Sequence, residues 1–458
     1  MDRWLKAALD YVPSWLEYQL RISRQPGCVI AVVHRGRIVF EQAFGVADLA
    51  TGAKLTPRHR FRIASHTKSF TAAGIMKLRE RRKLKLDDPV GDYVKGINPA
   101  IAGATIGQIL SHSAGIARDG TDSGQFNDWR PFPKSDALLA DLAAPPVIEP
   151  NTRFKYSNHG YSLLGIVIAA IAGEPYGRWM KREIVEASGL AETEPDMPIK
   201  AGTPFASGHS GEALMGQRVV VPGDYPTNAI APAGGIVSTA HDVALYFASL
   251  APNARTSVLS PASRREMTRP HWRDPHAAME SYYGLGIMSG TLNGWAWFGH
   301  GGGLQGYISR TVTLPGQDLA ISILTNATDG LAGPWVDGTI HLLRAFAQNG
   351  PPSRRVSDWT GRWWNNWGPV DLIAMGNKVM ATMPGAWNPL LDASEIEITR
   401  RDSGVIKLAE GYRSHGEPVR RVRDKRGRVI EMWLGAGKVM PEGKVAADMR
   451  RRYKPART

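Results

Sequence analysis

The sequence predicts an α+β domain followed by a smaller all-β domain. Strand-like apolar runs stand near the N-terminus, at 29–33 and 38–40, and return late, between 295 and 324. The long segment between them is rich in Gly and Pro and reads mostly as helix and loop. Early strands, a helical middle and late strands are typical of an α+β domain. In such a domain the N- and C-terminal strands share one antiparallel sheet, and the helical insertion covers one side of it.

The N-terminal part of the first domain is predicted to contain a helix, a hairpin and a second helix. The first helix is indicated by apolar residues at helical spacing: Leu5, Leu9, Val12, Leu16 and Leu20. Two strands follow, Val29–Val33 and Ile38–Phe40, and the turn between them contains Gly36, where a positive φ would be needed. The second helix is expected from Ser65 to about Arg82, with its apolar side chains at the helical period: Phe70, Ala73, Met76 and Leu78.

The late part of the first domain is predicted to supply three strands and a last helix. Trp295–Phe298 and Tyr307–Leu314 are the first two strands, and the turn Pro315–Asp318 leads into a buried strand at Leu319–Leu324. A helix is expected from Trp335 to Gln348.

A linker separates this part of the chain from a β-rich segment. Residues 349–353 read Asn-Gly-Pro-Pro-Ser, the clearest linker in the sequence. Beyond it, short strand-like pieces alternate with turns of Gly, Asn, Asp and Pro, which predicts a small β-barrel or sandwich. We therefore expect a first domain over 1–348 and a β-barrel-like domain over 354–458. Four tryptophans of the second domain are expected to pack in its core or between the domains: Trp359, Trp363, Trp364 and Trp367.

The composition is that of a globular protein, with 43% hydrophobic and 21% charged residues. The longest apolar run, Tyr161–Ala172, is shorter than the roughly 18 residues of a bilayer span, so no membrane insertion is expected. The N-terminal segment lacks the pattern of a secretory signal, and the single cysteine, Cys28, excludes an internal disulfide. Both observations favour a cytoplasmic protein.

No cofactor, metal ion or nucleic acid is expected as a partner. The net charge of +14 includes the basic runs 420–426 and 450–452, but no nucleic-acid-binding motif accompanies them. The twelve histidines show no ligand spacing. Residues 301–306 satisfy G-x-G-x-x-G, but strand-like residues follow where a dinucleotide-binding turn needs a helix.

Ser65-His66-Thr67-Lys68 places a serine and a lysine one helical turn apart. A serine hydroxyl is a poor nucleophile until a base removes its proton. A lysine can be that base only where burial and nearby positive charge lower its pKa. The N-terminus of a helix would also present free N–H groups to a developing oxyanion. S-x-x-K occurs by chance in many proteins of this length, so alone it is equally compatible with an ordinary helix.

Two further segments carry residues suited to the same chemistry. In Tyr156-Ser157-Asn158, the tyrosine could exist as a phenolate or share the lysine's proton and pass it to a leaving group. Asn158 offers an amide donor and a carbonyl acceptor for fixing Lys68 or a substrate. In His300-Gly301-Gly302-Gly303 the glycines allow close approach of a substrate, and the N–H of Gly303 is a candidate oxyanion donor beside that of Ser65. Each segment alone also suits an ordinary loop or turn.

In the order S-x-x-K, Y-x-N, H-x-G, these segments resemble the motifs of the penicillin-recognising serine hydrolases. That group contains class C β-lactamases, DD-carboxypeptidases, D-aminopeptidases and β-lactamase-like esterases. The resemblance covers about residues 20–345 and includes 105–115 and 232–239. It implies a β-lactamase/transpeptidase-like domain with an antiparallel sheet flanked by helices. It also implies the catalytic roles. Ser65 is acylated, Lys68 is its base, Tyr156 shuttles the proton, and Asn158 supplies the positioning amide.

One departure narrows the expected activity. Class C β-lactamases usually have K-T-G where this chain has His300-Gly301-Gly302, and the family's Lys and Thr help to hold a substrate carboxylate. The H-x-G form and a trailing lipocalin-like barrel resemble D-aminopeptidases and related esterases, and they imply a catalytic role for His300 and substrate contacts for Gly301 and Gly302. We expect a peptidase or amidase acting on small peptides or amino-acid amides, with D-stereospecificity left open. A carboxylesterase is the alternative, β-lactamase or DD-carboxypeptidase activity comes third, and a non-catalytic binding protein fourth. The expected partner is a small-molecule or peptide substrate, and exposed strand edges leave a homo-oligomer open.

Overall fold

The computed structural model describes residues 1–221, 223–277, 280–409 and 414–454. They fall into two compact units. One unit is Gln25–Val336, and the other combines Met1–Arg24 with Asp337–Thr458.

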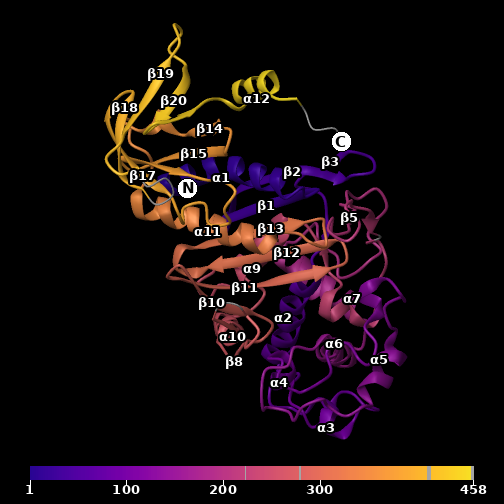
Figure 1. The fold of residues 1–458 in the computed structure, drawn as a ribbon. Helices are drawn as coiled ribbons and strands as arrows, with labels where there is room; N and C mark the ends of the chain where they lie inside the picture. The colour runs from indigo at the N-terminus through magenta and orange to yellow at the C-terminus, as the bar shows by residue number, and fades with distance from the viewer. Residues whose placement is uncertain (222, 278–279, 410–413, 455–458) are drawn as a thin grey trace. The chain divides into compact units, whose positions relative to one another are not determined.

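The first unit is built on a nine-stranded antiparallel sheet (Figure 1), with the strand order β3-β2-β1-β13-β12-β11-β10-β9-β8. The strands are β1 Gly27–His34, β2 Arg37–Asp48, β3 Ala53–Lys54, β8 Trp272–Arg273, β9 Ser281–Tyr283, β10 Met288–Leu292, β11 Trp295–Leu304, β12 Tyr307–Leu314 and β13 Leu319–Thr325. β1 pairs with β13, so that Cys28 lies opposite Thr325 and His34 opposite Leu319. Both strands are buried along their whole length. The early and late strands therefore share one antiparallel sheet, as the sequence predicted.

Helices fill the chain between the early and late strands. They are α2 Thr67–Glu80, α3 Pro99–Ala102, α4 Ile106–Leu110, α5 Ser135–Leu142, α6 Asn158–Ala172, α7 Tyr176–Met180, α8 Ala231–Gly234, α9 Ala240–Ser249 and α10 Pro261–Thr268. α9 packs on β1 and β13, whereas α2 packs against α6 and α8. Two short strand pairs complete the unit: β4 Phe61–Arg62 with β7 Val237–Ser238, and β5 Gly208–His209 with β6 Val220–Val221. The apolar faces of α2, α6 and α9 join one continuous core.

The second unit contains an eight-stranded antiparallel sheet with sequential order β14 to β21. The strands are β14 Gly361–Asn365, β15 Gly368–Met375, β16 Lys378–Thr382, β17 Ser394–Arg400, β18 Ser403–Leu408, β19 Pro418–Arg423, β20 Val429–Leu434 and β21 Gly437–Val439. Trp364 and Met440 exchange two backbone hydrogen bonds of 2.8 Å, which bring β14 next to the end of β21. The sheet is thus a nearly closed barrel around an apolar core, and it confirms the predicted all-β domain.

Three helices accompany the barrel: α1 Arg3–Ile22, α12 Glu442–Arg452 and the C-terminal part of α11 Ala332–Asn349. The two compact units therefore do not divide at the expected linker, 349–353. α1 and the residues from Asp337 onward belong to the same unit as the barrel. Contacts within this unit give the reason. Tyr11 donates a hydrogen bond of 2.6 Å to Asp371, and the Gln19 amide donates one of 2.7 Å to the Pro384 carbonyl.

The tryptophans of the barrel have different environments. Trp359 is fully buried in the barrel core, whereas Trp367 is 96% exposed, so the expected packing role does not hold for Trp367.

Cys28 is buried, and burial raises the pKa of its thiol. Among the described helices, none combines the length and the apolar character needed to cross a bilayer. The described part of the chain also contains no group of three or more His, Cys, Asp or Glu residues that could hold a metal ion.

Candidate active site

Ser65 lies in a short 3-10 turn, Ala64–His66, between β4 and α2. Regular α-helix therefore starts two residues later than predicted. From Phe61 to Met76, Ser65 is the one residue that is not buried. Ala64 has a φ of +48°, an unfavourable conformation for a residue with a Cβ, and such strain recurs next to catalytic groups. The Thr67 hydroxyl stabilises the turn by donating a 2.7 Å hydrogen bond to the Ala64 carbonyl.

Lys68 is completely buried one turn after Ser65. Its Nζ lies 3.1 Å from Ser65 Oγ, 2.7 Å from Asn158 Oδ1 and 2.8 Å from the Ala233 carbonyl oxygen. Burial holds the pKa of Lys68 well below its ordinary value; Asp119 raises it and Arg118 lowers it by smaller amounts. A neutral amine has two protons and one lone pair. In that neutral form, the Asn158 Oδ1 and the Ala233 carbonyl oxygen would accept the two protons and leave the lone pair for Ser65.

The Tyr156 hydroxyl also hydrogen-bonds to the Ser65 side chain. The Tyr156 ring centroid is 4.8 Å from Lys68 Nζ and 4.2 Å from the ring centroid of His112. Burial is the largest influence on the Tyr156 hydroxyl and raises its pKa, although Ser65 and Arg118 oppose this effect. Tyr156 is therefore a neutral phenol near pH 7, which favours the proton-sharing alternative over the phenolate.

Asn158 is the first residue of α6, and a second residue fixes the orientation of its amide. Its Oδ1 accepts from Lys68, while its Nδ2 donates a 2.6 Å hydrogen bond to Asp119 Oδ1. Asp119 is 9% exposed and also pairs with Arg118 Nε at 3.1 Å. Since a carboxylate only accepts, it keeps the amide nitrogen of Asn158 away from Lys68. Sequence reasoning missed Asp119, which follows the 105–115 segment and belongs to none of the three motifs.

His300 is placed differently from the other predicted site residues. It lies in β11, is 2% exposed, and does not line the pocket beside Ser65. Its Nδ1 is 2.6 Å from the Gly301 carbonyl, so it donates, and its Nε2 accepts from the Tyr283 hydroxyl at 3.0 Å. Burial holds the pKa of His300 well below its ordinary value. The structure therefore gives His300 the contacts of a neutral positioning residue, and its predicted catalytic role stays a prediction.

The three glycines after His300 bring β11 close to the turn that carries Ser65. A Cβ at Gly302 would overlap the carbonyl oxygen of Ile63, so β11 can approach the turn only because glycine stands there. β10 pairs with β11 no further than Gly299, which leaves the edge of the following residues without a strand partner on that side. Gly303 lies on this segment and lines the pocket next to Ser65, as an oxyanion donor would. A Cβ at Gly301 would make ordinary van der Waals contacts, the nearest at 3.6 Å from the Ser309 carbonyl oxygen.

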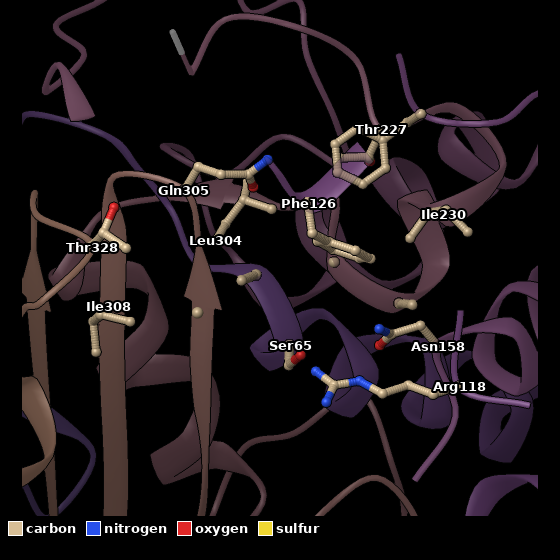
Figure 2. Close-up of a pocket in the computed structure, with 15 residues that line it drawn as sticks. Ser65, Arg118, Phe126, Asn158, Thr227, Ile230, Leu304, Gln305, Ile308 and Thr328 are labelled. Atoms are coloured by element: carbon tan, nitrogen blue, oxygen red, sulfur yellow. The ribbon is translucent and has the colours of Figure 1, made fainter. Parts of the chain in front are cut away.

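A cavity of about 280 Å³ opens beside Ser65 (Figure 2). Its lining residues are Ala64, Ser65, Arg118, Phe126, Phe132, Asn158, Thr227, Ile230, Ala233, Gly234, Gly303, Leu304, Gln305, Ile308 and Thr328. Most of the wall is apolar. The structure thus places Ser65, Asn158 and Gly303 at one pocket and brings Lys68 and Tyr156 into contact with Ser65, whereas His300 lies in β11 and does not line the pocket.

Known proteins resemble this chain in sequence and in fold. The Beta-lactamase family model matches residues 12–341. Penicillin-binding protein 4 of Amycolatopsis lactamdurans is 29% identical over 315 residues, which is 66% of this chain and 81% of that protein. Protein flp of Staphylococcus aureus is 29% identical over 187 residues, 39% of this chain and 36% of its own length.

Solved structures share the fold. The octameric penicillin-binding protein homologue from Pyrococcus abyssi superposes with a TM-score of 0.66 at 22% identity, covering 94% of this chain and 99% of that one. A D-stereospecific amidohydrolase from Streptomyces gives a TM-score of 0.57 at 24% identity, covering 70% and 94%. The hydrolase EstCE1 gives 0.63 at 20%, covering 75% and 98%. The family match over most of the chain agrees with the contacts of Lys68 and Tyr156 with Ser65, and the chain belongs to the β-lactamase family of serine hydrolases.

Proposed function

We propose that this protein hydrolyses amide bonds of small peptides or amino-acid amides through an acyl-enzyme at Ser65. The observation that carries the proposal is the neutral phenol of Tyr156, hydrogen-bonded to the same Ser65 side chain that Lys68 contacts. An amine leaves only if it receives a proton, whereas an alkoxide or phenoxide needs one far less. A partly buried neutral phenol next to the reacting serine is therefore most useful to an amidase.

Acylation follows from the contacts of Lys68. The neutral amine accepts the Ser65 proton as Oγ attacks the amide carbon, and the N–H groups of Ser65 and Gly303 stabilise the oxyanion. When the C–N bond breaks, Tyr156 donates its proton to the departing nitrogen and recovers one from the Lys68 ammonium. A water molecule then attacks the acyl carbon, its proton returns through the same pair, and Ser65 leaves as a hydroxyl.

The surroundings of His300 argue against β-lactams as the main substrates. Where the K-T-G motif supplies a cation for the substrate carboxylate, this chain has a neutral imidazole whose two nitrogens are both engaged within the protein. The fold shared with a D-stereospecific amidohydrolase supports an amide substrate and leaves D-residues within the proposal. The mostly apolar pocket wall favours the alternative function, a carboxylesterase. The fold shared with an octameric homologue supports a homo-oligomer.

The test is kcat/KM for D-alanine p-nitroanilide, L-alanine p-nitroanilide and a p-nitrophenyl ester, measured on the wild type and on Ser65→Ala. Anilide cleavage that disappears in Ser65→Ala supports the amidase function, and the D/L ratio gives the stereochemical preference. Cleavage of the ester alone supports the esterase instead. Activity that survives Ser65→Ala overturns the assignment of the nucleophile.

A further inference from the structure

Arg118 is the one charged residue among the described residues that line the pocket. The remaining wall is apolar or carries only neutral polar groups. Figure 2 shows the Arg118 side chain extending toward Ser65. Its side chain is 66% exposed, so the guanidinium is open to the solvent of the cavity. No catalytic step described above uses Arg118.

The backbone of Arg118 is fixed to the catalytic segment. Its carbonyl accepts hydrogen bonds of 2.9 and 3.2 Å from the N–H groups of Asn158 and His159, which open α6. The neighbouring Ala117 carbonyl accepts a 2.7 Å bond from the Ser157 hydroxyl. These contacts tie the loop that carries Arg118 to the residues that follow Tyr156, so the side chain starts from a defined point beside the leaving-group proton donor.

The Arg118 guanidinium uses one of its three nitrogens for an ion pair within the protein and has two left to bind a substrate. Asp119 pairs with Nε at 3.1 Å, and both Nη groups lack a partner among the described residues. The two Nη groups present N–H donors in a rigid plane, and such a pair matches the two oxygens of a carboxylate. The guanidinium carbon lies 5.8 Å from the centroid of the Tyr156 ring. An anion bound there would lie next to the group that protonates the leaving amine.

We propose, on the basis of the amidase function above, that Arg118 binds the α-carboxylate of the leaving amino acid. In an amino-acid leaving group the carboxylate is separated from the amide nitrogen by a single carbon, so both can reach the Tyr156–Arg118 region together. The apolar part of the pocket, including Phe126, Phe132 and Leu304, takes the acyl side. The substrate class is then a short peptide or N-acyl amino acid with an apolar acyl residue and a free C-terminal carboxylate.

The test compares N-acetyl-phenylalanyl-alanine with its C-terminal carboxamide, each as the D,D and L,L forms. Wild type, Arg118→Gln, Arg118→Lys and the control Arg269→Gln are assayed after thermal melting has shown that each is folded. Arg269 is exposed, pairs with Glu266 and does not line the pocket. We expect the wild type to prefer the free acid. Arg118→Gln should lower this preference by roughly 10- to 100-fold, chiefly through KM, because hydrogen bonds to a charged group are lost.

The other outcomes are equally informative. Arg118→Lys should retain part of the preference, since the charge remains but the planar donor pair is lost, and Arg269→Gln should retain all of it. Equal rates on acid and carboxamide in the wild type would overturn the proposal. So would equal losses on both in Arg118→Gln with a shifted pH profile, because Arg118 would then act only on the pKa values of Lys68 and Tyr156. If no amide is cleaved in a Ser65-dependent way, the amidase function itself has failed, and an ester pair differing in the same carboxylate tests Arg118 separately.

Discussion

Asp119 offers the sharpest test of how Lys68 becomes a base. Its carboxylate holds the amide of Asn158 through a 2.6 Å hydrogen bond, and Asn158 in turn accepts from Lys68 at 2.7 Å. Asp119 thus fixes the orientation of the Asn158 amide, and its negative charge raises the pKa of Lys68. Asp119→Asn keeps an acceptor for the Asn158 amide and removes the charge, whereas Asp119→Ala removes both.

The magnitude follows from the two hydrogen bonds in series. Charges on the order of 7 Å apart interact by roughly 2 kcal/mol at an effective dielectric constant of about 20. The negative charge stabilises the ammonium form of Lys68 and so raises the pKa of Lys68, and the opposite influence of Arg118 reduces the net effect. Because Arg118 is unchanged in Asp119→Asn, the Lys68 pKa should fall further by the whole Asp119 contribution, roughly 1.5 units. Since catalysis needs the neutral amine, the acid limb of the kcat/KM–pH profile should move to lower pH by about that amount.

The assay is a kcat/KM–pH profile on the best amide substrate for the wild type, Asp119→Asn, Asp119→Ala and the control Asp122→Asn. Asp122 is an exposed loop residue paired with Arg130. Asp119→Ala should lower the plateau by about 10- to 100-fold, because the Asn158 amide loses its fixed orientation. Asp122→Asn should match the wild type. An acid limb that stays in place or moves to higher pH in Asp119→Asn would refute the electrostatic argument.

Three further predictions concern the proton donor, the strand and the barrel. Tyr156→Phe should lower kcat/KM by at least about 100-fold on an amide and by much less on a p-nitrophenyl ester; equal losses would contradict the assigned shuttle. Gly302→Ala should destabilise the protein by about 1–3 kcal/mol in thermal unfolding and impair activity, because the added Cβ overlaps a backbone carbonyl, whereas Gly301→Ala has room and should do neither. Trp359→Ala should cost about 3–5 kcal/mol in denaturant unfolding and the exposed Trp367→Ala under about 0.5 kcal/mol, and similar values for both would disprove the packing difference.

The sequence predicted the sheet because its strands are short, apolar and clearly separated by turns. β1 and β13 are buried on both faces, so continuous apolar runs such as Leu319–Leu324 identified them without ambiguity. The unit to which α1 belongs was not predictable in the same way. The apolar stripe from Leu5 to Leu20 shows that one face is buried, but it does not show which surface covers that face. Buried polar contacts such as Tyr11–Asp371 connect residues 360 positions apart, which periodicity cannot reveal.

The candidate site was predictable to the extent that its residues lie in motifs. Ser65, Lys68, Tyr156 and Asn158 converge as predicted, and their catalytic roles stay predictions. Asp119 was missed because its importance arises from one hydrogen bond to a residue 39 positions later in the chain. Arg118 was missed for a related reason: basic residues are common on surfaces, and only the backbone bonds to α6 direct this one to the pocket.

The proposed proton transfers explain why the groups around Ser65 have pKa values shifted toward their neutral forms. Burial lowers the pKa values of Lys68, His112 and His300, and it raises that of Tyr156. Each of these shifts favours the uncharged form of its group. In the proposed mechanism, one proton moves to Lys68 when Ser65 attacks and one negative charge appears on the oxyanion, so the new charges form as a close pair within a low-dielectric site. A permanently charged lysine could accept no proton, and a phenolate could donate none to the leaving amine. The burial that favours the neutral form of each group is thus the same feature that would let one proton pass from Ser65 to the leaving group.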